Sequence, residues 1–346
     1  AYTACNGYEE NDCFGAIDPE RNERWRHLRK QHARSPFNIL IQGGDQMYAD
    51  DVWRDVPQLV AWQGFSWRAR LNARFSAADR EAVADYYFDR YCRLWGQPDL
   101  APILASIPSL MMWDDHDIFD GWGSHAAAKQ RCPVFQGVWS AAREQFALFQ
   151  LASRPNDLPA GFGDPRGSHF GWVYDLGDTG VIAPDLRSQR TRRQVMSEGG
   201  WHWLVAALAR LGHCRHVLFV STVPVLNINL SLLERIIAPL PEGRHFYQDD
   251  LRDQWRSHAH RREWRRLVGH LLDFCRCNDT RVTILSGEIH LGALGVVEQS
   301  ETRIFQLTSS GIVHHPPPRF VAWLFDLLGR KSSIVMPGVR MRMLPL

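Results

Sequence analysis

Residues 38–51 read NILIQGGDQMYADD, and this stretch decides how the rest of the chain is interpreted. Its apolar run, Ile39 to Ile41, predicts a short buried strand that ends at a pair of glycines. Two glycines allow the backbone to turn sharply and to approach a ligand closely. Asp45 follows them directly, and Tyr48 comes three residues later. Carboxylates at the carboxyl end of a buried strand are what a metal or phosphate site in an open α/β sheet requires.

Other predicted strands end in the same kind of residue. The apolar run 107–113 leads into Asp-Asp-His-Asp at 114–117, and the run 281–285 leads to Glu288 and His290. Cys5 would end a further strand if residues 1–4 close one. A single aspartate after a strand is often only a helix cap. Several such strand ends in one chain indicate a shared site instead.

Buried strands alternate with amphipathic helices along the chain, which predicts a mixed α/β fold. The expected strands are 38–41, 107–113, 170–176, 181–184, 216–220, 281–285, 292–297 and 304–307. The expected helices are 20–34, 77–95, 136–151, 201–211, 264–275 and 320–328. No repeat or linker divides the sequence, so we expect a single domain over 1–346, with about 314–346 as a helical and loop extension.

The composition excludes several classes of protein. The 346 residues are 45% hydrophobic and 23% charged with a net charge of +2, so no strong field favours nucleic acid. No apolar run approaches the roughly 18 residues of a membrane helix, and no secretory leader is present. Seven cysteines without a CxxC pair make a poor disulfide framework. Both a cytoplasmic and an exported location fit these features, and the oligomeric state is left open.

Five blocks carry a resemblance to a known family: GDQMYADD, MMWDDHDIFDGWGSH, PDLRSQR, DDLRDQW and LSGEIHLGALG. Together they resemble the signature blocks of the alkaline phosphatase D (PhoD-like) family, within the calcineurin-like metallophosphatase superfamily. The resemblance implies a four-layer α/β/β/α sandwich of the metallo-dependent phosphatase type. It also implies hydrolysis of phosphate esters by in-line attack of a metal-bound hydroxide, at a site with two or three metal ions.

The resemblance also assigns metal ligands. Cys5 matches a thiolate ligand of iron, Asp45 the carboxylate that bridges the metals, and Tyr48 an iron-binding tyrosinate. Asp115 falls on the position that binds the second metal, with Asp114 as the alternative if the register is one residue off.

The last block supplies two more ligands, Glu288 and His290, where the superfamily has a pair of histidines. PhoD-like proteins usually carry Asp at the position of Glu288. The extra methylene shifts the carboxylate by about 1.5 Å, which can change how it binds a metal.

The same resemblance gives catalytic and substrate-binding roles. His116 falls on the catalytic histidine, and Asp117 is expected to orient its imidazole. Arg187 is a candidate phosphate clamp, because a guanidinium matches phosphoryl geometry, or else it forms a salt bridge to Asp185 or another acid. Asn6 either contacts substrate or holds the turn at Cys5.

Several neighbouring residues are assigned supporting or surface roles. Asp50 and Asp51 are expected to support the site or cap a helix rather than bind metal. His314 and His315 are expected in a solvated loop, with a place at the rim of the pocket as the alternative.

A charge count indicates the metals. The five acidic ligands supply five negative charges if all are ionised: Cys5, Asp45, Tyr48, Asp115 and Glu288. One ferric ion with one divalent ion balances that charge, and thiolate and phenolate suit trivalent iron. The sequence therefore predicts Fe(III) with one or two divalent ions. Ca is the ion that the family suggests, and Zn, Mn or Mg are competing occupants.

The predicted function is a metal-dependent phosphoesterase, an alkaline phosphatase or phosphodiesterase, that acts on small phosphate esters. An alternative is a specialised phosphodiesterase or phospholipase on lipid or cell-wall phosphates, with Phe320, Trp323 and Phe325 lining an apolar groove. A degenerate binding module is disfavoured, because it would have lost ligands and this chain departs only at Glu288.

Overall fold

The structure is a computed structural model. It describes residues 1–7, 21–164, 168–228, 253–287, 289–314 and 331–344, with the single positions 323, 327 and 329. The chain divides into two compact units, and each is described by itself. The first holds 1–159, 165–167 and 311–315, and the second holds 160–164, 168–310 and 316–346. The single domain over 1–346 stays a prediction.

A small parallel sheet organises the first unit. Among the described residues it has three strands in the order β1-β2-β3: β1 (Tyr2–Thr3), β2 (Leu40–Gly43) and β3 (Ser109–Met112). Both pairings are parallel, with Tyr2 opposite Ile41 and Gly43 opposite Met112. All three strands therefore reach their carboxyl ends at the same edge of the sheet.

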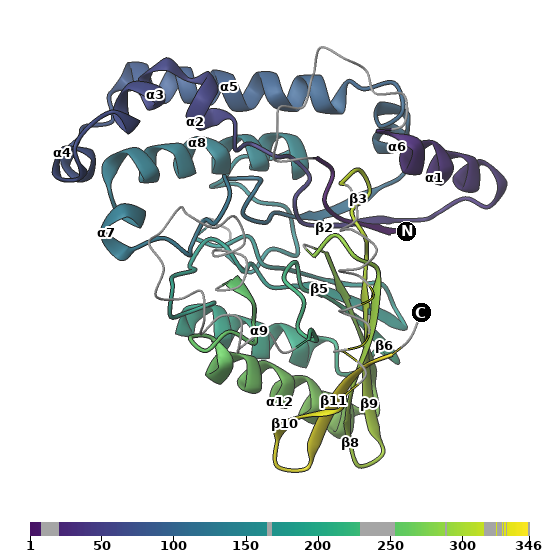
Figure 1. Cartoon of the computed structure of the whole chain (residues 1–346). Helices are drawn as coiled ribbons and strands as arrows, with labels where there is room; N and C mark the ends of the chain where they lie inside the picture. The colour runs from purple at the N-terminus through teal and green to yellow at the C-terminus, as the bar shows by residue number, and fades with distance from the viewer. Residues whose placement is uncertain are drawn as a thin grey trace. The chain divides into compact units, whose positions relative to one another are not determined.

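Helices make up most of the rest of the first unit. Those described are α1 (Glu23–Arg34), α2 (Val52–Asp55), α3 (Pro57–Gln63), α4 (Trp67–Asn72), α5 (Ala77–Trp95), α6 (Ala101–Ser106), α7 (Ala127–Gln130) and α8 (Pro133–Gln150). The longest, α5, starts with a capping box between Ser76 and Asp79, and it packs beside α8 (Figure 1). Its buried side chains recur every three or four residues, as on one helix face.

A larger mixed sheet organises the second unit. In the described part of the chain it has eight strands in the order β10-β11-β8-β9-β7-β6-β5-β4. These are β4 (Trp172–Asp175), β5 (Thr179–Ala183), β6 (His216–Val220), β7 (Arg281–Ser286), β8 (Ala293–Gln299), β9 (Thr302–Thr308), β10 (Ser333–Met336) and β11 (Val339–Leu344). Strands β5, β6, β7 and β9 run parallel, and the other pairings are antiparallel.

Two helices, α9 (Glu198–Arg210) and α12 (Arg261–Asn278), lie side by side in the second unit (Figure 1). Their apolar faces pack into a core with the strands of the sheet. Glu263 anchors α12, since its carboxylate accepts hydrogen bonds from the backbone N–H groups of Val195 (2.9 Å) and Met196 (3.1 Å). None of the helices described here is long and apolar enough to span a lipid bilayer.

The mixed α/β class predicted from the sequence is confirmed. Helix α5 and strand β6 have the predicted bounds, and β1 does precede Cys5. The tail differs, because residues 333–344 form the hairpin β10–β11 and not a loop. Ile334, Val335 and Met336 precede Pro337-Gly338, and Gly338 has a φ of 76°, which is typical of a hairpin turn. The expected helix 320–328 falls almost entirely outside the described residues.

Candidate metal centre

The three strands of the first unit deliver their metal-binding residues to one edge. Cys5 lies two residues after β1, Asp45 two residues after β2, and Asp115 three residues after β3. All three side chains are buried. Because the strands are parallel and in register, the three loops that carry these residues start side by side.

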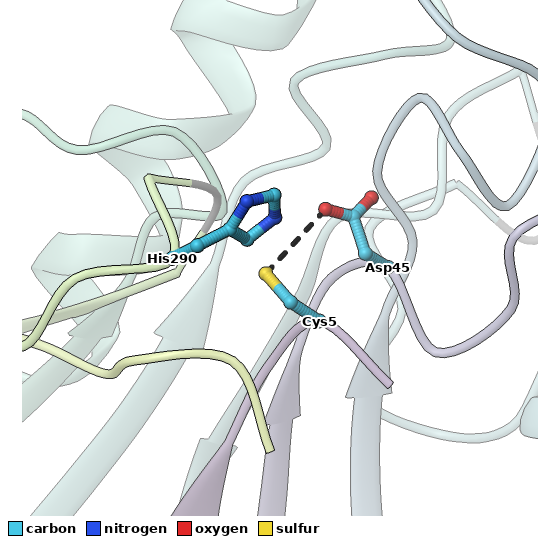
Figure 2. Close-up of side chains that lie close together, drawn as sticks. All are labelled: Cys5, Asp45 and His290. Atoms are coloured by element: carbon cyan, nitrogen blue, oxygen red, sulfur yellow. Dashed lines mark hydrogen bonds between the residues drawn. The ribbon is translucent and has the colours of Figure 1, made fainter. Parts of the chain in front are cut away.

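Cys5 and Asp45 face each other across the first two loops. Their Sγ and Oδ2 atoms are 3.6 Å apart, and Figure 2 shows the thiol pointing toward the carboxylate. Both residues have left-handed backbones, with φ values of 56° and 54°, directly beside Gly44 at 105°. Two backbone hydrogen bonds hold the turn, from Cys5 N–H to Gly44 O and from Asn6 N–H to Asp45 O.

The Asp45 carboxylate lies in a site that favours a cation. Burial and the neighbouring carboxylates of Asp114, Asp115 and Asp117 raise the pKa of Asp45 well above its ordinary value, although His116 opposes them. Its Oδ1 atom is buried and has no hydrogen-bond partner among the described residues. Crowded carboxylates with an unsatisfied oxygen are stabilised when a metal ion binds between them.

The donor atoms also fit a metal ion in number and spacing. One ligand atom each of Asp45, Asp115 and His116 lie within 4.8 Å of one another. This group includes Asp115, and the choice of Asp115 over Asp114 as a ligand stays a prediction. Asp115 also accepts a hydrogen bond at Oδ2 from Gly121 N–H at 3.0 Å, which fixes its orientation. The carboxylates of Asp45 and Asp115, with the Cys5 thiol beside Asp45, therefore fit a metal centre.

His116 is oriented by Asp50. The His116 Nδ1 atom lies 2.9 Å from Asp50 Oδ2, and the other Asp50 oxygen accepts from Asp120 N–H at 2.6 Å. Burial by itself lowers the pKa of His116, but Asp50, Asp115 and Asp45 outweigh it and raise that pKa well above its ordinary value. The imidazole is thus held in one orientation and favours its protonated form.

Asp117 does not take the position beside His116 that the sequence predicted for it. Its carboxylate turns inward and accepts hydrogen bonds from four groups: the N–H groups of Gln46, Met47 and Asp114, and the Gln150 side chain. Burial raises the pKa of Asp117 to about 7, although the hydrogen bonds from Asp114, Gln150 and Met47 oppose this shift. Asp117 therefore ties the loops after β2 and β3 to α8, and the orienting role belongs to Asp50.

The Tyr48 ring contacts two imidazoles. Its ring stacks on His116 with 4.2 Å between centroids, and His314 lies on it at 5.9 Å. Residues 312–314 reach this place because the N–H groups of Val313 and His314 donate to the Cys5 carbonyl. The ring also needs Gly7, since a Cβ added there would lie 2.5 Å from Tyr48 Cδ2.

Asn6 holds the turn at Cys5. Its Nδ2 donates to Gln46 O at 3.2 Å, and its Oδ1 accepts from Trp25 Nε1–H at 2.7 Å. The side chain is buried, so the structural alternative left open by the sequence is what the structure shows. A contact between Asn6 and substrate stays a prediction.

Arg187 belongs to the second unit and pairs with Asp253. It is fully buried, with its guanidinium on one carboxylate oxygen of Asp253, while Arg190 Nε donates to the other at 2.6 Å. Asp185 accepts a hydrogen bond from the backbone N–H of Arg187 at 2.8 Å. The salt-bridge alternative is therefore present with Asp253 as partner, and phosphate clamping stays a prediction.

The two remaining predicted ligands also belong to the second unit. Glu288 lies outside the described residues. His290 is half-buried, follows β7, and has a left-handed φ of 54°, like Cys5 and Asp45. Their participation in the metal centre stays a prediction.

A family comparison adds to this geometry. The family model described as PhoD related phosphatase matches residues 20–247, more than half of the chain.

The chain belongs to the PhoD related phosphatase family.

The individual proteins that match this PhoD-family chain share little sequence identity with it. An uncharacterized protein of Saccharomyces cerevisiae is 24% identical over 410 residues, which cover 93% of this chain and 58% of that protein. The chain thus spans a little over half of the length of this curated relative. The solved structure of PhoD shares the fold, with a TM-score of 0.58 at 13% identity, over 90% of this chain and 56% of PhoD. The structure of a dimetal phosphatase of Danio rerio matches with a TM-score of 0.47 at 14% sequence identity. The match covers 91% of this chain and 88% of that protein.

Two residues of the PhoD-family chain have more specific contacts here than the sequence predicts. The supporting role predicted for Asp50 is a contact with the His116 ring. The sequence favours a solvated loop over the pocket rim for His314, and the structure joins the His314 backbone to Cys5. Its position depends on a contact across more than 300 residues of sequence, which no local pattern reveals.

Proposed function

We propose that this PhoD-family chain is a metal-dependent phosphoesterase that hydrolyses small phosphate esters. The observation that carries the proposal is the edge of the first sheet, where parallel strands present Cys5, Asp45 and the pair Asp115–His116. Donor atoms from two of these loops lie within 4.8 Å of one another, and a buried Asp45 oxygen has no hydrogen-bond partner among the described residues. Membership of a phosphatase family supports the same reading.

Asp45 is the proposed bridge between two metal ions. Cys5 and Tyr48 are the proposed ligands of Fe(III), and Asp115 is the proposed ligand of a divalent ion, with calcium preferred over zinc, manganese or magnesium. Glu288 and His290 complete the set as the sequence predicts. The thiol and the phenol support a trivalent ion, because soft or strongly donating anionic ligands suit iron better than they suit calcium.

His116 is the proposed proton donor to the leaving group. Its Nδ1 faces Asp50, so Nε2 is the nitrogen left to exchange a proton with an ester oxygen. Asp50 stabilises the imidazolium and fixes the ring plane, and Tyr48 supports one face of the ring. Bound metal ions would neutralise charge on the phosphoryl group and lower the pKa of a bound water. Residues of the chain contribute positioning, protonation and exclusion of solvent.

The proposal is tested by hydrolysis assays on the full chain, reconstituted with iron and calcium. Nitrophenyl phosphate and bis-nitrophenyl phosphate are compared, since the ratio of their rates separates a monoesterase from a diesterase. Asp45→Asn is expected to lower turnover on both by about a thousandfold or more, because the bridging charge is lost. Asp89→Asn, an exposed residue of α5, is the matched control and is expected to keep full activity.

Absence of hydrolysis of either ester by the metal-loaded chain would overturn the proposal. Equal activity in Asp45→Asn and Asp89→Asn would show that Asp45 is not part of the active site, while the proposed hydrolysis itself would stand. A strong preference for the diester would favour the specialised phosphodiesterase alternative. Of the tail residues invoked for that alternative, Trp323 is 65% exposed, and Phe320 and Phe325 lie outside the described residues.

Iron is tested separately by metal analysis and by the visible spectrum. The purified chain is expected to contain iron and to absorb through thiolate-to-iron and tyrosinate-to-iron charge transfer. Tyr48→Phe and Cys5→Ser should each remove one component of that absorption. A chain that is active but has no iron and no visible band would contradict Fe(III) and leave two divalent ions as the occupants.

A further inference from the structure

A second group of metal-binding side chains lies in the second unit. Asp175 ends β4, and His213 and Cys214 lie in the loop between α9 and β6. His213 Nε2 is 2.9 Å from Asp175 Oδ2 and 3.8 Å from Cys214 Sγ. One ligand atom of each residue lies within 4.8 Å of the other two. The His213 and Asp175 side chains are 59% and 45% exposed, whereas Cys214 is buried.

The arrangement of these atoms is not that of a nucleophile and its base. A relay of thiol, imidazole and carboxylate uses one ring nitrogen for the thiol and the other for the carboxylate. Here Cys214 and Asp175 both face the same nitrogen of His213.

The spacing matches a tetrahedral metal shell instead. With metal–ligand bonds of about 2.0 Å to nitrogen or oxygen and 2.3 Å to sulfur, ligand atoms in a tetrahedron lie roughly 3.3 to 3.6 Å apart. The observed 2.9 and 3.8 Å bracket that range, so small side-chain rotations suffice. We propose that Asp175, His213 and Cys214 bind a divalent transition metal ion of the zinc type, with water in the fourth position.

The ligand chemistry selects this class of ion. A thiolate and an imidazole suit zinc, whereas calcium and magnesium require shells made mostly of oxygen. Two anionic ligands and one neutral imidazole balance the charge of one divalent ion. Exposure of His213 and Asp175 leaves the fourth position open to solvent.

This group lies at the opposite ends of the strands from the predicted phosphatase residues of the second unit. Strands β5 and β6 are parallel, and the group is beside their amino ends, next to the turn Asp175–Thr179. Arg187 follows the carboxyl end of β5, and His290 follows that of β7. A strand of five residues separates the two ends by roughly 16 Å. The two sites are therefore distinct within this unit.

A metal ion here would brace two loops. The turn after β4 is already joined to the loop before β6, because the N–H groups of Arg215 and His216 donate to Asp178 O. Cys214 Sγ also lies 3.4 Å from Gly177 O. An ion shared by Asp175, His213 and Cys214 would close the same junction through side chains and stabilise the sheet at this edge.

The test is a cobalt(II) titration of the full chain in the presence of calcium, with zinc competition. Wild-type protein is expected to bind one more equivalent of cobalt than His213→Gln or Cys214→Ser. This cobalt should give thiolate-to-cobalt absorption, and added zinc should remove that absorption. Loss of one ligand should weaken binding at this site by at least about tenfold, as even changes outside a metal's first ligands do. Zinc should also raise the unfolding midpoint of wild type more than that of His213→Gln.

Matched controls keep the test decisive. His202→Gln and Cys277→Ser change an exposed histidine and an exposed cysteine elsewhere in this unit, and both are expected to behave as wild type. All these proteins keep Cys5, so any cobalt bound through Cys5 contributes equally to each titration and does not affect the comparison. His213 is exposed, so its variant is expected to fold even if Cys214→Ser does not. Equal stoichiometry and equal affinity in wild type and His213→Gln would overturn the proposal and leave an ordinary surface ion pair.

Discussion

Cys5 and Asp45, two residues of the proposed metal centre, both have left-handed backbones. Residues other than glycine lose roughly 1 to 2 kcal/mol in this conformation, and both residues adopt it, at φ values of 56° and 54°. Their backbone hydrogen bonds to each other's loops offset that cost. The thiol and the carboxylate are therefore fixed 3.6 Å apart by the fold itself. A preorganised pair of this kind binds a metal with little further loss of entropy.

The proposed role of His116 and Asp50 can be distinguished from that of the metal ligands by comparing esters with different leaving groups. His116→Ala is expected to lower turnover about a hundredfold or more on an alkyl phosphate, where the leaving oxygen needs a proton. The loss on nitrophenyl phosphate should be much smaller. Asp50→Asn should show the same pattern more weakly, because the ring keeps a hydrogen bond but loses the neighbouring charge. Equal losses on both esters, measured as kcat/KM, would remove His116 from this role.

Gly7 can be tested by adding one carbon atom. Gly7→Ala places a Cβ 2.5 Å from Tyr48 Cδ2, so the phenol ring must move. We expect a shifted or weakened tyrosinate-to-iron band and a several-fold loss of activity. Gly269→Ala on α12 is the matched control, because its added Cβ meets nothing within 4 Å and alanine favours a helix. An unchanged spectrum in Gly7→Ala would argue against Tyr48 as an iron ligand.

The positions of the proposed metal ligands after strands could be predicted because they obey a local rule. Cys5, Asp45 and Asp115 each follow a short buried strand, and that pattern is readable from a single sequence. The partner of His116 could not be predicted in the same way. Asp117 is adjacent in sequence, but the turn at 114–117 directs its carboxylate inward, toward four donors. Side-chain direction in a loop depends on backbone angles that the residue pattern does not specify.

At the scale of elements, buried polar groups hold the amino end of α12 in place. His260 forms its N-cap residue, with Nδ1 3.2 Å from Ser257 Oγ and Nε2 3.3 Å from the carbonyl of Thr191. A neutral imidazole can accept at the first nitrogen and donate at the second. Burial, with Arg190 nearby, lowers the pKa of His260 from 6.5 to about 4.

The pH dependence of stability should reflect this histidine. The unfolded chain binds a proton at His260 below about pH 6.5, whereas the folded chain resists protonation until about pH 4. Stability is therefore complete above pH 6.5 and falls as the pH drops from 6.5 toward 4. His260→Gln should lose part of that slope, measured by urea unfolding at several pH values between 4 and 7.5. Identical slopes in the two proteins would contradict the lowered pKa.

Regular elements could be predicted wherever hydrophobic periodicity was strong. Helix α5 and strand β6 have the expected bounds because an amphipathic or a continuous apolar pattern covers each from end to end. Strand β2 begins at Leu40, two residues later than expected. The short helices α2, α3 and α4 were not predicted, since four to seven residues hold too few turns to show a period. The β10–β11 hairpin was missed although its alternation and its Pro-Gly turn are visible in the sequence.

At the scale of the whole molecule, metal removal should affect stability as well as activity. Chelation leaves the buried carboxylates around Asp45 without a cation, and a ligand present at about 100 times its Kd stabilises a folded protein by about 2.7 kcal/mol. We therefore expect a chelator to lower the unfolding midpoint by a few degrees and to abolish hydrolysis, with both restored by metal. Asp45→Asn is the control, since its midpoint should respond much less. An unfolding midpoint that stays the same after chelation would show that the stability of the fold does not depend on this centre.

The first unit is discontinuous in sequence, because residues 311–315 return to it after the chain has built the second sheet. Protein synthesis proceeds from the amino end at about 5 to 20 residues per second. The loop that carries Cys5 is therefore translated well before Ile312, Val313 and His314, which hydrogen-bond to Ala4 and Cys5. During this interval a nascent chain lacks the segment that hydrogen-bonds to the carbonyl groups of Ala4 and Cys5. The backbone contacts around Cys5, a residue of the proposed metal centre, are thus completed late in biosynthesis.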